Sequence, residues 1–416
     1  MIGLFPCNFA VPVRAAHFRG LLALVVLMTA AIFAAAQAGQ LDPTFANNGI
    51  FSNSFNTSPA FATAVALRSD GKIVVGGEIG NSGAIIRLNT NGTLDTSFGS
   101  GGVVTIRFRD VQNVTTGLAV QSDGKIVVAG TGLPQGGELD RLNSNGSFDS
   151  TFGSNGVVGL GNTPGFLALQ TDGKILLTDA VPGSAVREIQ RFQTNGQPDT
   201  SFGTGGSAAL VGPGPITLQA DGKILVPTDS FTGGAMVARY TSSGSLDTGF
   251  GIAGQAGAVS GLAAVAVQAD GHIVSAGTGT SQVSLNGNSF VFGLERFSAN
   301  GTIDTKFGTR GGVFTNFPNS AGSVANAHVI QPNGDIVAAG SAGIPGTQVA
   351  STFALARYLI TGKLDTSFGN GGLVTTNFGN NATASITAIA LQSDGKIVAV
   401  GSDGGGTLIV ARYLGQ

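Results

Sequence analysis

The 416-residue chain has one cysteine, three histidines and no tryptophan. A single cysteine can form neither an internal disulfide nor a cysteine-rich metal site, and three histidines leave no histidine-rich one. Charged residues make up only 11% of the chain, against about 25% in an average domain. With a formal net charge of −2, the chain is not built to neutralise phosphates, which argues against a nucleic-acid partner.

Glycine is the residue in excess, with 67 copies that do not follow the G-X-Y period of collagen. A hydrophobic content of 42% argues against intrinsic disorder. No nucleophile elbow, calcium loop or phosphate loop is evident. We therefore assign no catalytic residue, no metal ligand and no cofactor from the sequence.

The N-terminal region has the pattern of an export signal. Arg14, His17 and Arg19 precede an apolar run from residue 21 to residue 36, and Ala36-Gln37-Ala38 fits a small-residue cleavage site. The run is shorter than the ~20 residues that span a bilayer comfortably, although an uncleaved anchor is the alternative. The pattern predicts a signal peptide over residues 1–38 and one domain over residues 39–416, without a membrane span. The mature protein would be secreted, periplasmic or attached to the cell surface.

Three short segments recur seven times along the predicted domain, which indicates a repeat architecture. The first reads L-D-T-S-F-G-x-x-G, with its phenylalanine at Phe45, Phe98, Phe152, Phe202, Phe250, Phe307 and Phe368. The second reads S-D-G-K-I-V, with its turn glycine at Gly71, Gly124, Gly173, Gly222, Gly271, Gly334 and Gly395. The third reads A-R-Y, with its arginine at Arg87, Arg141, Arg191, Arg239, Arg296, Arg357 and Arg412.

Each unit contains four strand-like runs, which in the second unit are residues 117–121, 125–130, 138–142 and 156–160. Asp123-Gly124 between the first two predicts a two-residue hairpin turn with positive φ at both residues. Four strands in each of seven units predict an all-β, seven-bladed β-propeller with four antiparallel strands per blade. The domain opens on the end of a unit and stops after a third strand. The N-terminal strand is therefore expected to complete the last blade and close the ring.

The L-D-T-S-F-G-x-x-G and S-D-G-K-I-V segments resemble the delta-60 repeat, a bacterial family of β-propeller domains of unknown function. The resemblance covers residues 41–416. It implies a propeller fold and export, and it brings no reaction, substrate or site residue.

In six units an aspartate stands eight residues after the repeat arginine, and ring closure would supply the seventh partner. We expect these pairs to be structural, because opposite charges that flank a hairpin turn attract each other, or because the aspartate caps its own turn. The pairs are Arg87–Asp95, Arg141–Asp149, Arg191–Asp199, Arg239–Asp247, Arg296–Asp304, Arg357–Asp365 and Arg412–Asp42. The lysine of the S-D-G-K turn is replaced by His272 and Asp335 in two units, which suggests a solvated position.

The connections between units vary, whereas the Asp-Gly and Asn-Gly turns are regular. Since turns alternate between the two ends of a meander, the variable connections are expected to share one face around the hub. Variable loops on a rigid scaffold are common binding sites, although neutral drift would also vary them. The candidate binding-face residues are Glu78, Arg107, Arg109, Asp110, Asp179, Asp229 and Asp403.

The sequence favours an exported scaffold that binds an unknown glycan or protein through this face, and a non-enzymatic role. The alternative is a secreted polysaccharide lyase or hydrolase with acidic residues at the channel mouth, because fold alone does not choose between binding and catalysis. Two or more of the acidic candidates converging in a deep pocket with Arg107 or Arg109 would favour the enzyme.

Overall fold

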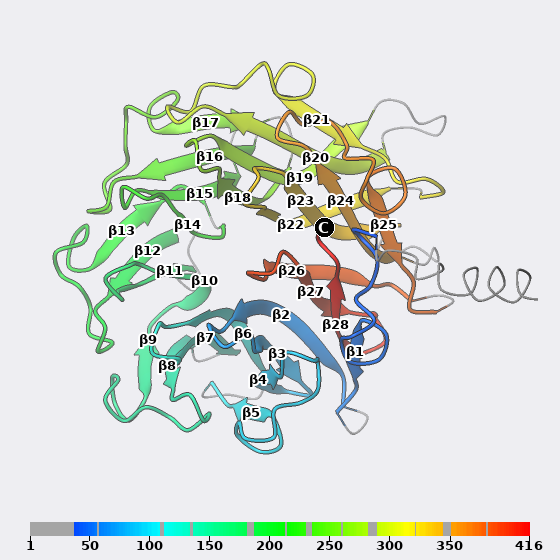
Figure 1. Ribbon diagram of the computed structural model, residues 1–416. Helices are drawn as coiled ribbons and strands as arrows, with labels where there is room; N and C mark the ends of the chain where they lie inside the picture. The colour runs from blue at the N-terminus through cyan, green and yellow to red at the C-terminus, as the bar shows by residue number, and fades with distance from the viewer. Residues whose placement is uncertain are drawn as a thin grey trace, which may run out of the picture. The chain divides into compact units, whose positions relative to one another are not determined.

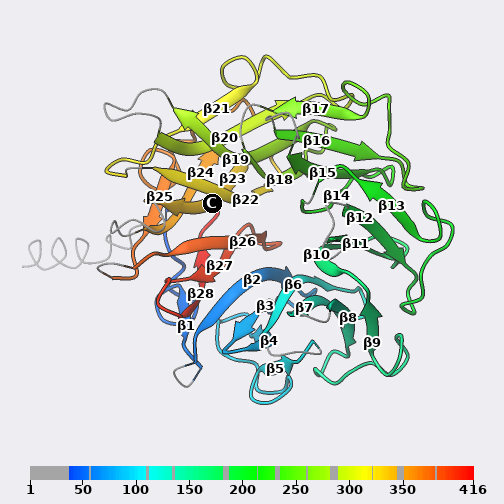
Figure 2. The ribbon, with the colours of Figure 1, turned by 180° about the vertical axis from the view of Figure 1, so that it is seen from behind.

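The chain forms a ring of seven four-stranded antiparallel sheets (Figures 1 and 2). The computed structural model describes residues 37–55, 58–108, 112–133, 136–180, 187–212, 214–229, 235–258, 261–281, 289–320, 322–343, 351–379 and 382–416. This part of the chain contains strands and turns but no helix, and hence no helix long and apolar enough to cross a membrane. The predicted all-β, seven-bladed propeller is confirmed.

The blades are numbered 1 to 7 from the N-terminus, and the strands of each are described from the hub outward. The innermost strands are β2 (Ala60–Leu67), β6 (Gln112–Val120), β10 (Thr163–Leu169), β14 (Thr217–Leu218), β18 (Gly261–Val267), β22 (Ser323–Ile330) and β26 (Ser385–Leu391). The second strands are β3 (Ile73–Ile79), β7 (Ile126–Leu133), β11 (Ile175–Ala180), β15 (Ile224–Asp229), β19 (Ile273–Ser281), β23 (Ile336–Ala342) and β27 (Ile397–Ser402). The third strands are β4 (Ser82–Leu88), β8 (Gly136–Leu142), β12 (Arg187–Phe192), β16 (Ala235–Tyr240), β20 (Ser289–Phe297), β24 (Thr352–Tyr358) and β28 (Leu408–Tyr413). The outermost strands are β5 (Val103–Ile106), β9 (Val157–Leu160), β13 (Ser207–Leu210), β17 (Gln255–Ala258), β21 (Gly312–Thr315), β25 (Leu373–Thr376) and, in blade 7, β1 (Ile50–Asn53).

The turn between the first two strands of a blade differs from the expected two-residue type. In blade 2 the backbone N–H of Gly124 donates to the carbonyl of Gln121, and that of Gln121 donates to the carbonyl of Lys125. The positive φ falls on Gly124 alone, at 84°. This is a type I turn followed by a left-handed glycine, a three-residue hairpin loop. Asp123 supports it by accepting the backbone N–H of Lys125 through Oδ1 at 3.0 Å.

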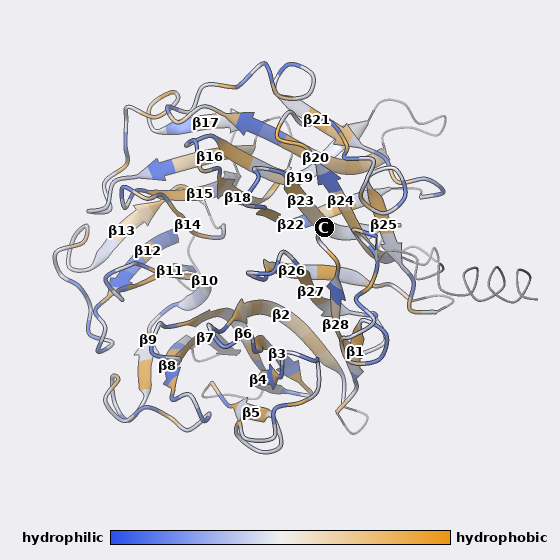
Figure 3. Cartoon of the chain, viewed as in Figure 1, coloured by the Kyte–Doolittle hydropathy of each residue, from blue (hydrophilic) through white to orange (hydrophobic). Residues whose placement is uncertain are grey.

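Apolar side chains pack between neighbouring blades rather than within one blade. Seven buried clusters occupy the seven junctions; at the junction of blades 2 and 3, for example, Phe152 packs with Ile175 and Leu177. Figure 3 shows hydrophobic colour along much of β2, and a hydrophilic segment at the end of third strands such as β16, β24 and β28. Because each junction needs both of its blades, closure of the ring leaves no blade with an uncovered apolar face.

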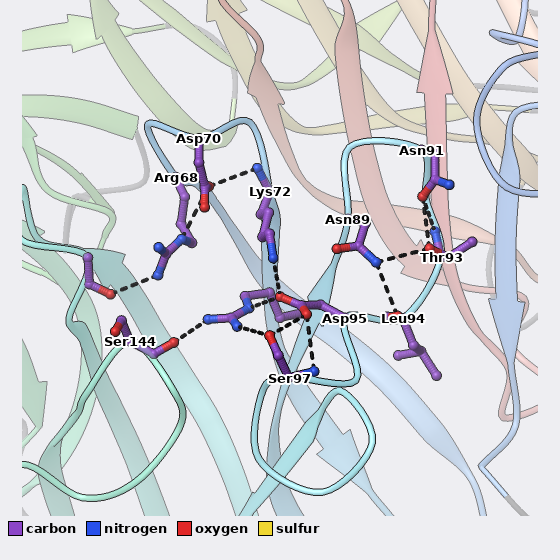
Figure 4. A network of polar contacts seen from close by, with 12 residues as sticks. Arg68, Asp70, Lys72, Asn89, Asn91, Thr93, Leu94, Asp95, Ser97 and Ser144 are labelled. Carbon is purple, nitrogen blue, oxygen red and sulfur yellow. Dashed lines mark hydrogen bonds and ion pairs between the residues drawn. The ribbon is translucent and has the colours of Figure 1, made fainter.

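The hydrophilic residue of the third strand is the repeat arginine, which clamps each blade to the next. In blade 1 the Arg87 Nε donates to Asp95 Oδ2 at 2.6 Å, and its NH1 donates to the carbonyl of Ser144 in blade 2. Its guanidinium carbon lies 4.4 Å from the ring centroid of Phe98, in cation–π contact. Lys72 Nζ reaches the same Asp95 oxygen at 2.6 Å (Figure 4).

All seven arginines make this set of contacts, and the seven predicted Arg–Asp pairs are observed. The turn lysine is therefore more than a solvated residue. Lysine reaches the aspartate of the pair in five blades at 2.6–3.4 Å, and His272 approaches it at 3.7 Å in blade 5. In blade 6, Asp335 takes the position and accepts the backbone N–H of Ile360 instead.

Blade 7 joins the two ends of the described chain, as predicted. Strand β1 pairs antiparallel with β28, with Ile50 opposite Ala411. Across the closure, Arg412 Nε donates to Asp42 Oδ2 at 2.9 Å. Asp42 is 2% exposed. Burial acts to raise the pKa of Asp42, but bonds from Thr44 and the charges of Arg412 and Lys396 outweigh burial and lower the pKa.

The turn that follows the third strand of blade 7 is assembled from both ends of the described chain. In other blades one turn supplies two carbonyls to the preceding blade; in blade 2, Ser144 accepts from the arginine and Asn145 accepts from Gly99 N–H. In blade 7, Gly415 accepts from Arg357, whereas Ala38 accepts from Gly369 N–H at 2.8 Å. Residues from both ends of the described chain are thus needed to complete blade 7.

Replacing Asp42 by alanine is expected to destabilise the closed ring by about 3 kcal/mol, because it leaves the buried Arg412 without its carboxylate. Chemical denaturation followed by circular dichroism measures the change. Asp394 is the matched control, since it pairs with the same Lys396 but has a side chain that is 53% exposed. Asp394→Ser should cost less than about 1 kcal/mol. Equal losses in the two variants would contradict the clamp.

A chain that begins at Gln37 is expected to be more stable than one that begins at Gly39, by about 1–2 kcal/mol. The shorter chain loses the buried Ala38 and the acceptor for Gly369 N–H. Denaturation of the two purified chains, side by side, measures the difference. Identical midpoints would show that Ala38 adds nothing to blade 7. The cleavage position after Ala38 stays a prediction, which N-terminal sequencing of the exported protein tests.

Candidate functional site

The described candidate residues are spread over blades 1, 3, 4 and 7, and no hydrogen bond or ion pair among the described residues joins them. Glu78 is half-buried in β3, opposite Phe61 and Gly83, and burial raises its pKa. Asp403 follows β27 and caps its own loop, since its Oδ1 accepts the backbone N–H groups of Gly405 and Thr407. The Asp403 carboxylate is therefore committed to its own loop.

The structure also describes Arg107 and Asp229. Arg107 is exposed after β5, and Asp229 ends β15 opposite Ala235. Arg109 and Asp110 lie outside the described residues. The structure therefore supplies no described pocket in which two of the acidic candidates meet Arg107.

Asp179 is buried at the junction of blades 2 and 3. It lies opposite Glu188 on β12 and accepts a hydrogen bond from Asn162 Nδ2 at 3.1 Å. Burial is the main cause of a pKa raised to about 6; the Asn162 bond lowers it, and the Glu188 charge raises it. Glu188 in turn accepts a hydrogen bond from Ser207 Oγ at 2.7 Å. The buried Asp179 carboxyl and the half-buried Glu188 carboxyl thus form a polar group that faces the neighbouring blade.

Sequence reasoning missed a second buried acidic pair, Glu138 and Asp140 on β8. Side chains alternate along a strand, so both share the face of Leu142, which packs against blade 1. Asp140 is fully buried, and neither of its carboxylate oxygens has a hydrogen-bond partner among the described residues. Burial, and secondly the charge of Glu138, raise its pKa to about 8. The available signal was an aspartate where blades 1, 4 and 6 have Ile86, Ala238 and Ala356.

The innermost strands place one residue of nearly every blade at the hub through a β-bulge. The register of β2 against β3 breaks between Ala62 and Ala64, and leaves Thr63 unpaired. Equivalent breaks occur in β6, β10, β18, β22 and β26. A bulge re-aims the extra side chain. The unpaired residues are Thr63, Thr116, Gly165, Phe166, Ala263, Asn326 and Thr387.

All of these residues except Gly165 line a hub cavity of about 220 Å³, whose lining comes from all seven blades. The side chains that line it are Thr, Ala, Val, Leu, Ile, Phe, Pro and a single Asn, namely Asn326; none of the lining residues is titratable. Across the described residues, no three His, Cys, Asp or Glu side chains gather in a way that could hold a metal ion. The hub therefore offers hydroxyl, amide and apolar groups without formal charge.

Two larger grooves lie on the regular-turn face, on either side of blade 7. One, of about 730 Å³, lies between blades 7 and 1, and the other, of about 740 Å³, lies between blades 6 and 7. Their linings include Arg412 and Lys396, and Arg357 and Asp365, respectively. Since these side chains already pair within the clamps, we place the candidate site at the hub and its variable-loop mouth.

This architecture defines the class of protein: the chain is a seven-bladed β-propeller closed by its own termini. Five of its segments, residues 68–98, 121–152, 219–250, 268–307 and 331–368, match the family model described as "Domain of unknown function (DUF5122) beta-propeller". Each segment runs from an Asp-Gly or Asn-Gly turn to the repeat phenylalanine of the same unit. The match supports a β-propeller domain of unknown function. No curated protein matches the sequence.

Among solved structures, virginiamycin B lyase from Staphylococcus aureus is similar with a TM-score of 0.56 and 12% identity, over 88% of this chain and 99% of that one. A catalytically inactive variant of that lyase with quinupristin gives a TM-score of 0.55 and 13% identity, over the same shares. Polysaccharide lyase Uly1 gives a TM-score of 0.44 and 13% identity, over 85% of this chain and 90% of that one. At these identities the first two similarities show the propeller fold alone.

Replacing Asp140 by asparagine is expected to remove a pH-dependent loss of stability. The carboxyl binds its proton more tightly in the folded chain, with a pKa of about 8, than in the unfolded chain, where the ordinary value is 3.8. The free energy of unfolding of the native chain should therefore fall as pH rises from about 4 to about 8. Asparagine cannot ionise, so the variant should gain stability relative to the native chain over this range.

Denaturation midpoints at pH 5 and pH 8 test this expectation. Asp123→Asn is the control, because the Asp123 side chain is more than half exposed. A stability difference between native chain and Asp140→Asn that stays constant with pH would rule out the raised pKa.

Proposed function

We propose that the chain is an exported scaffold, made of delta-60 repeats, that binds a glycan or protein partner through the hub mouth and the variable loops around it. The observation that carries the proposal is the hub lining, in which neutral polar and apolar side chains surround a cavity. Such linings, with a few placed polar groups, are typical of binding sites.

The different roles of the two faces of the ring support this proposal. On the regular-turn face, repeated charged side chains are committed to inter-blade clamps. On the other face, the connections differ from blade to blade; β3 and β4 are joined by two residues, whereas β23 and β24 are joined by nine. Loops free of a structural role are able to diverge toward a ligand.

A secreted lyase or hydrolase is the second candidate, because the pKa of Asp179, at about 6, suits a general acid. Asp179 is nevertheless 3% exposed and lies opposite Glu188 between blades. A catalytic acid must reach substrate directly or through one water, so the burial of Asp179 favours binding over turnover.

The experiment is a binding screen of residues 37–416 against immobilised neutral and acidic polysaccharides, with soluble products assayed on each hit. In one variant, residues 282–288 and residues 344–350 are each replaced by two residues. The control carries Asp123→Ser and Asp172→Ser on the opposite face, where both side chains are more than half exposed. We expect the native chain to be retained on at least one polysaccharide without releasing soluble products. The loop variant should lose this retention, and the control should keep it. Release of products, or loss of retention only in the control, would overturn the proposal.

A further inference from the structure

The hub cavity is chemically two-sided, because its blades fall into a polar sector and an apolar sector. In blades 6, 7 and 1 the bulge side chain bonds to the next blade. Asn326 Nδ2 donates to the carbonyl of Ile386 at 2.7 Å, Thr387 Oγ1 to that of Ala62 at 2.8 Å, and Thr63 Oγ1 to that of Thr115 at 2.7 Å. In blade 2, Thr116 Oγ1 donates within its own blade to Ala129.

The opposite sector, from blade 3 to blade 5, presents Phe166, Pro215 and Ala263 to the cavity. None of these side chains has a polar atom. Phe166 is 42% exposed, which is unusual for an aromatic side chain on an innermost strand. Its backbone N–H donates to Thr178 Oγ1 at 2.9 Å, and this bond fixes the bulge that carries the ring.

In blades 3 and 4, the apolar sector has a local cause in the second strands. In blades 1, 5, 6 and 7 a glycine on the second strand faces the inner-strand carbonyl just before the bulge; a Cβ at Gly77 would lie 2.0 Å from the carbonyl oxygen of Phe61. Blades 3 and 4 have Asp179 and Thr228 at this position. Their inner strands depart accordingly, since β10 leaves Gly165 and Phe166 unpaired opposite Thr178 and β14 keeps two residues.

We propose that the hub cavity binds a single neutral sugar ring, with one apolar face against Phe166 and its hydroxyl groups toward Thr63, Thr116, Thr387 and Asn326. This inference deepens the proposed binding function and rests on it. The volume of 220 Å³ exceeds the ~150 Å³ of a cavity that accepts benzene, and therefore suits one substituted six-membered ring.

The hydrogen bonds already made by the polar sector determine which hydrogen-bonding groups a ligand must have. The hydroxyl hydrogens of Thr63, Thr116 and Thr387 are committed to backbone carbonyls, so their oxygens offer lone pairs to the cavity. The occupant must therefore donate hydrogen bonds. A cation could donate too, but no carboxylate lines the cavity to balance a charge removed from water. A polyol ring supplies several neutral donors and an apolar C–H face for the aromatic ring.

The test is ligand-observed NMR titration of residues 37–416 with methyl glucoside, methyl galactoside, methyl mannoside and N-acetylglucosamine. Cyclohexane-methanol and tetramethylammonium serve as apolar and cationic competitors. We expect at least one sugar to bind with a millimolar Kd and to outcompete both. Phe166→Ala should weaken that sugar about tenfold, as the loss of an aromatic contact does, and Thr116→Val, which is isosteric, should weaken it severalfold.

Phe148→Ala is the matched control, because Phe148 is also 42% exposed but lies in the turn after β8, away from the hub lining. It should leave sugar binding unchanged. The loop-shortened variant keeps the hub lining, so monosaccharide binding should persist there even if polysaccharide retention is lost; this separates the two proposals. Absence of binding by all four sugars, preference for either competitor, or equal losses in Phe148→Ala and Phe166→Ala would overturn the inference.

Discussion

The contact on which the ring depends is the bond from each repeat arginine to a turn carbonyl in the next blade. The guanidinium is planar and has five donors in fixed directions, so one side chain serves two blades at once. In blade 3, Arg191 donates to Asp199 at 2.7 Å through Nε, to the carbonyl of Ser242 in blade 4 at 2.7 Å, and lies over Phe202. A buried charge without such partners would be destabilising, so the arginine, its aspartate and the neighbouring turn are mutually required.

This interdependence explains why the two ends of the described chain meet within blade 7. Each arginine needs a turn carbonyl from the blade that follows, and blade 6 obtains it from Gly415 near the C-terminus. The same turn position also has to accept Gly369 N–H, and there Ala38 near the N-terminus supplies the oxygen. The seventh clamp, from Arg412 to Asp42 and the carbonyl of Thr90, then links blade 7 to blade 1. The ring is therefore closed by the same arginine clamp that joins the other blades, except that its residues come from two separate segments of the chain.

The sequence predicted this framework because its determinants repeat. The eight-residue spacing between arginine and aspartate recurs in six units, and the unmatched Arg412 and Asp42 required closure. The turn type was wrong: the S-D-G-K segment gives a type I turn and a left-handed Gly124, because the loop includes Ser122 as well as Asp-Gly. The contact of Lys72 with Asp95 was missed, since a position that also holds His272 and Asp335 suggested simple exposure.

The hub was less predictable, because its lining depends on where each inner strand bulges. Thr63, Gly165, Ala263 and Asn326 share no residue type, and only the backbone register shows that they occupy equivalent places. The change from glycine to Asp179 and Thr228 was visible in the sequence; its consequence for the facing strand was not. The altered inner strands of blades 3 and 4 are the basis for the proposed ligand site. A feature present in all seven blades maintains the ring, whereas a departure confined to neighbouring blades makes one side of the hub different from the other, and only an asymmetric hub can orient a ligand.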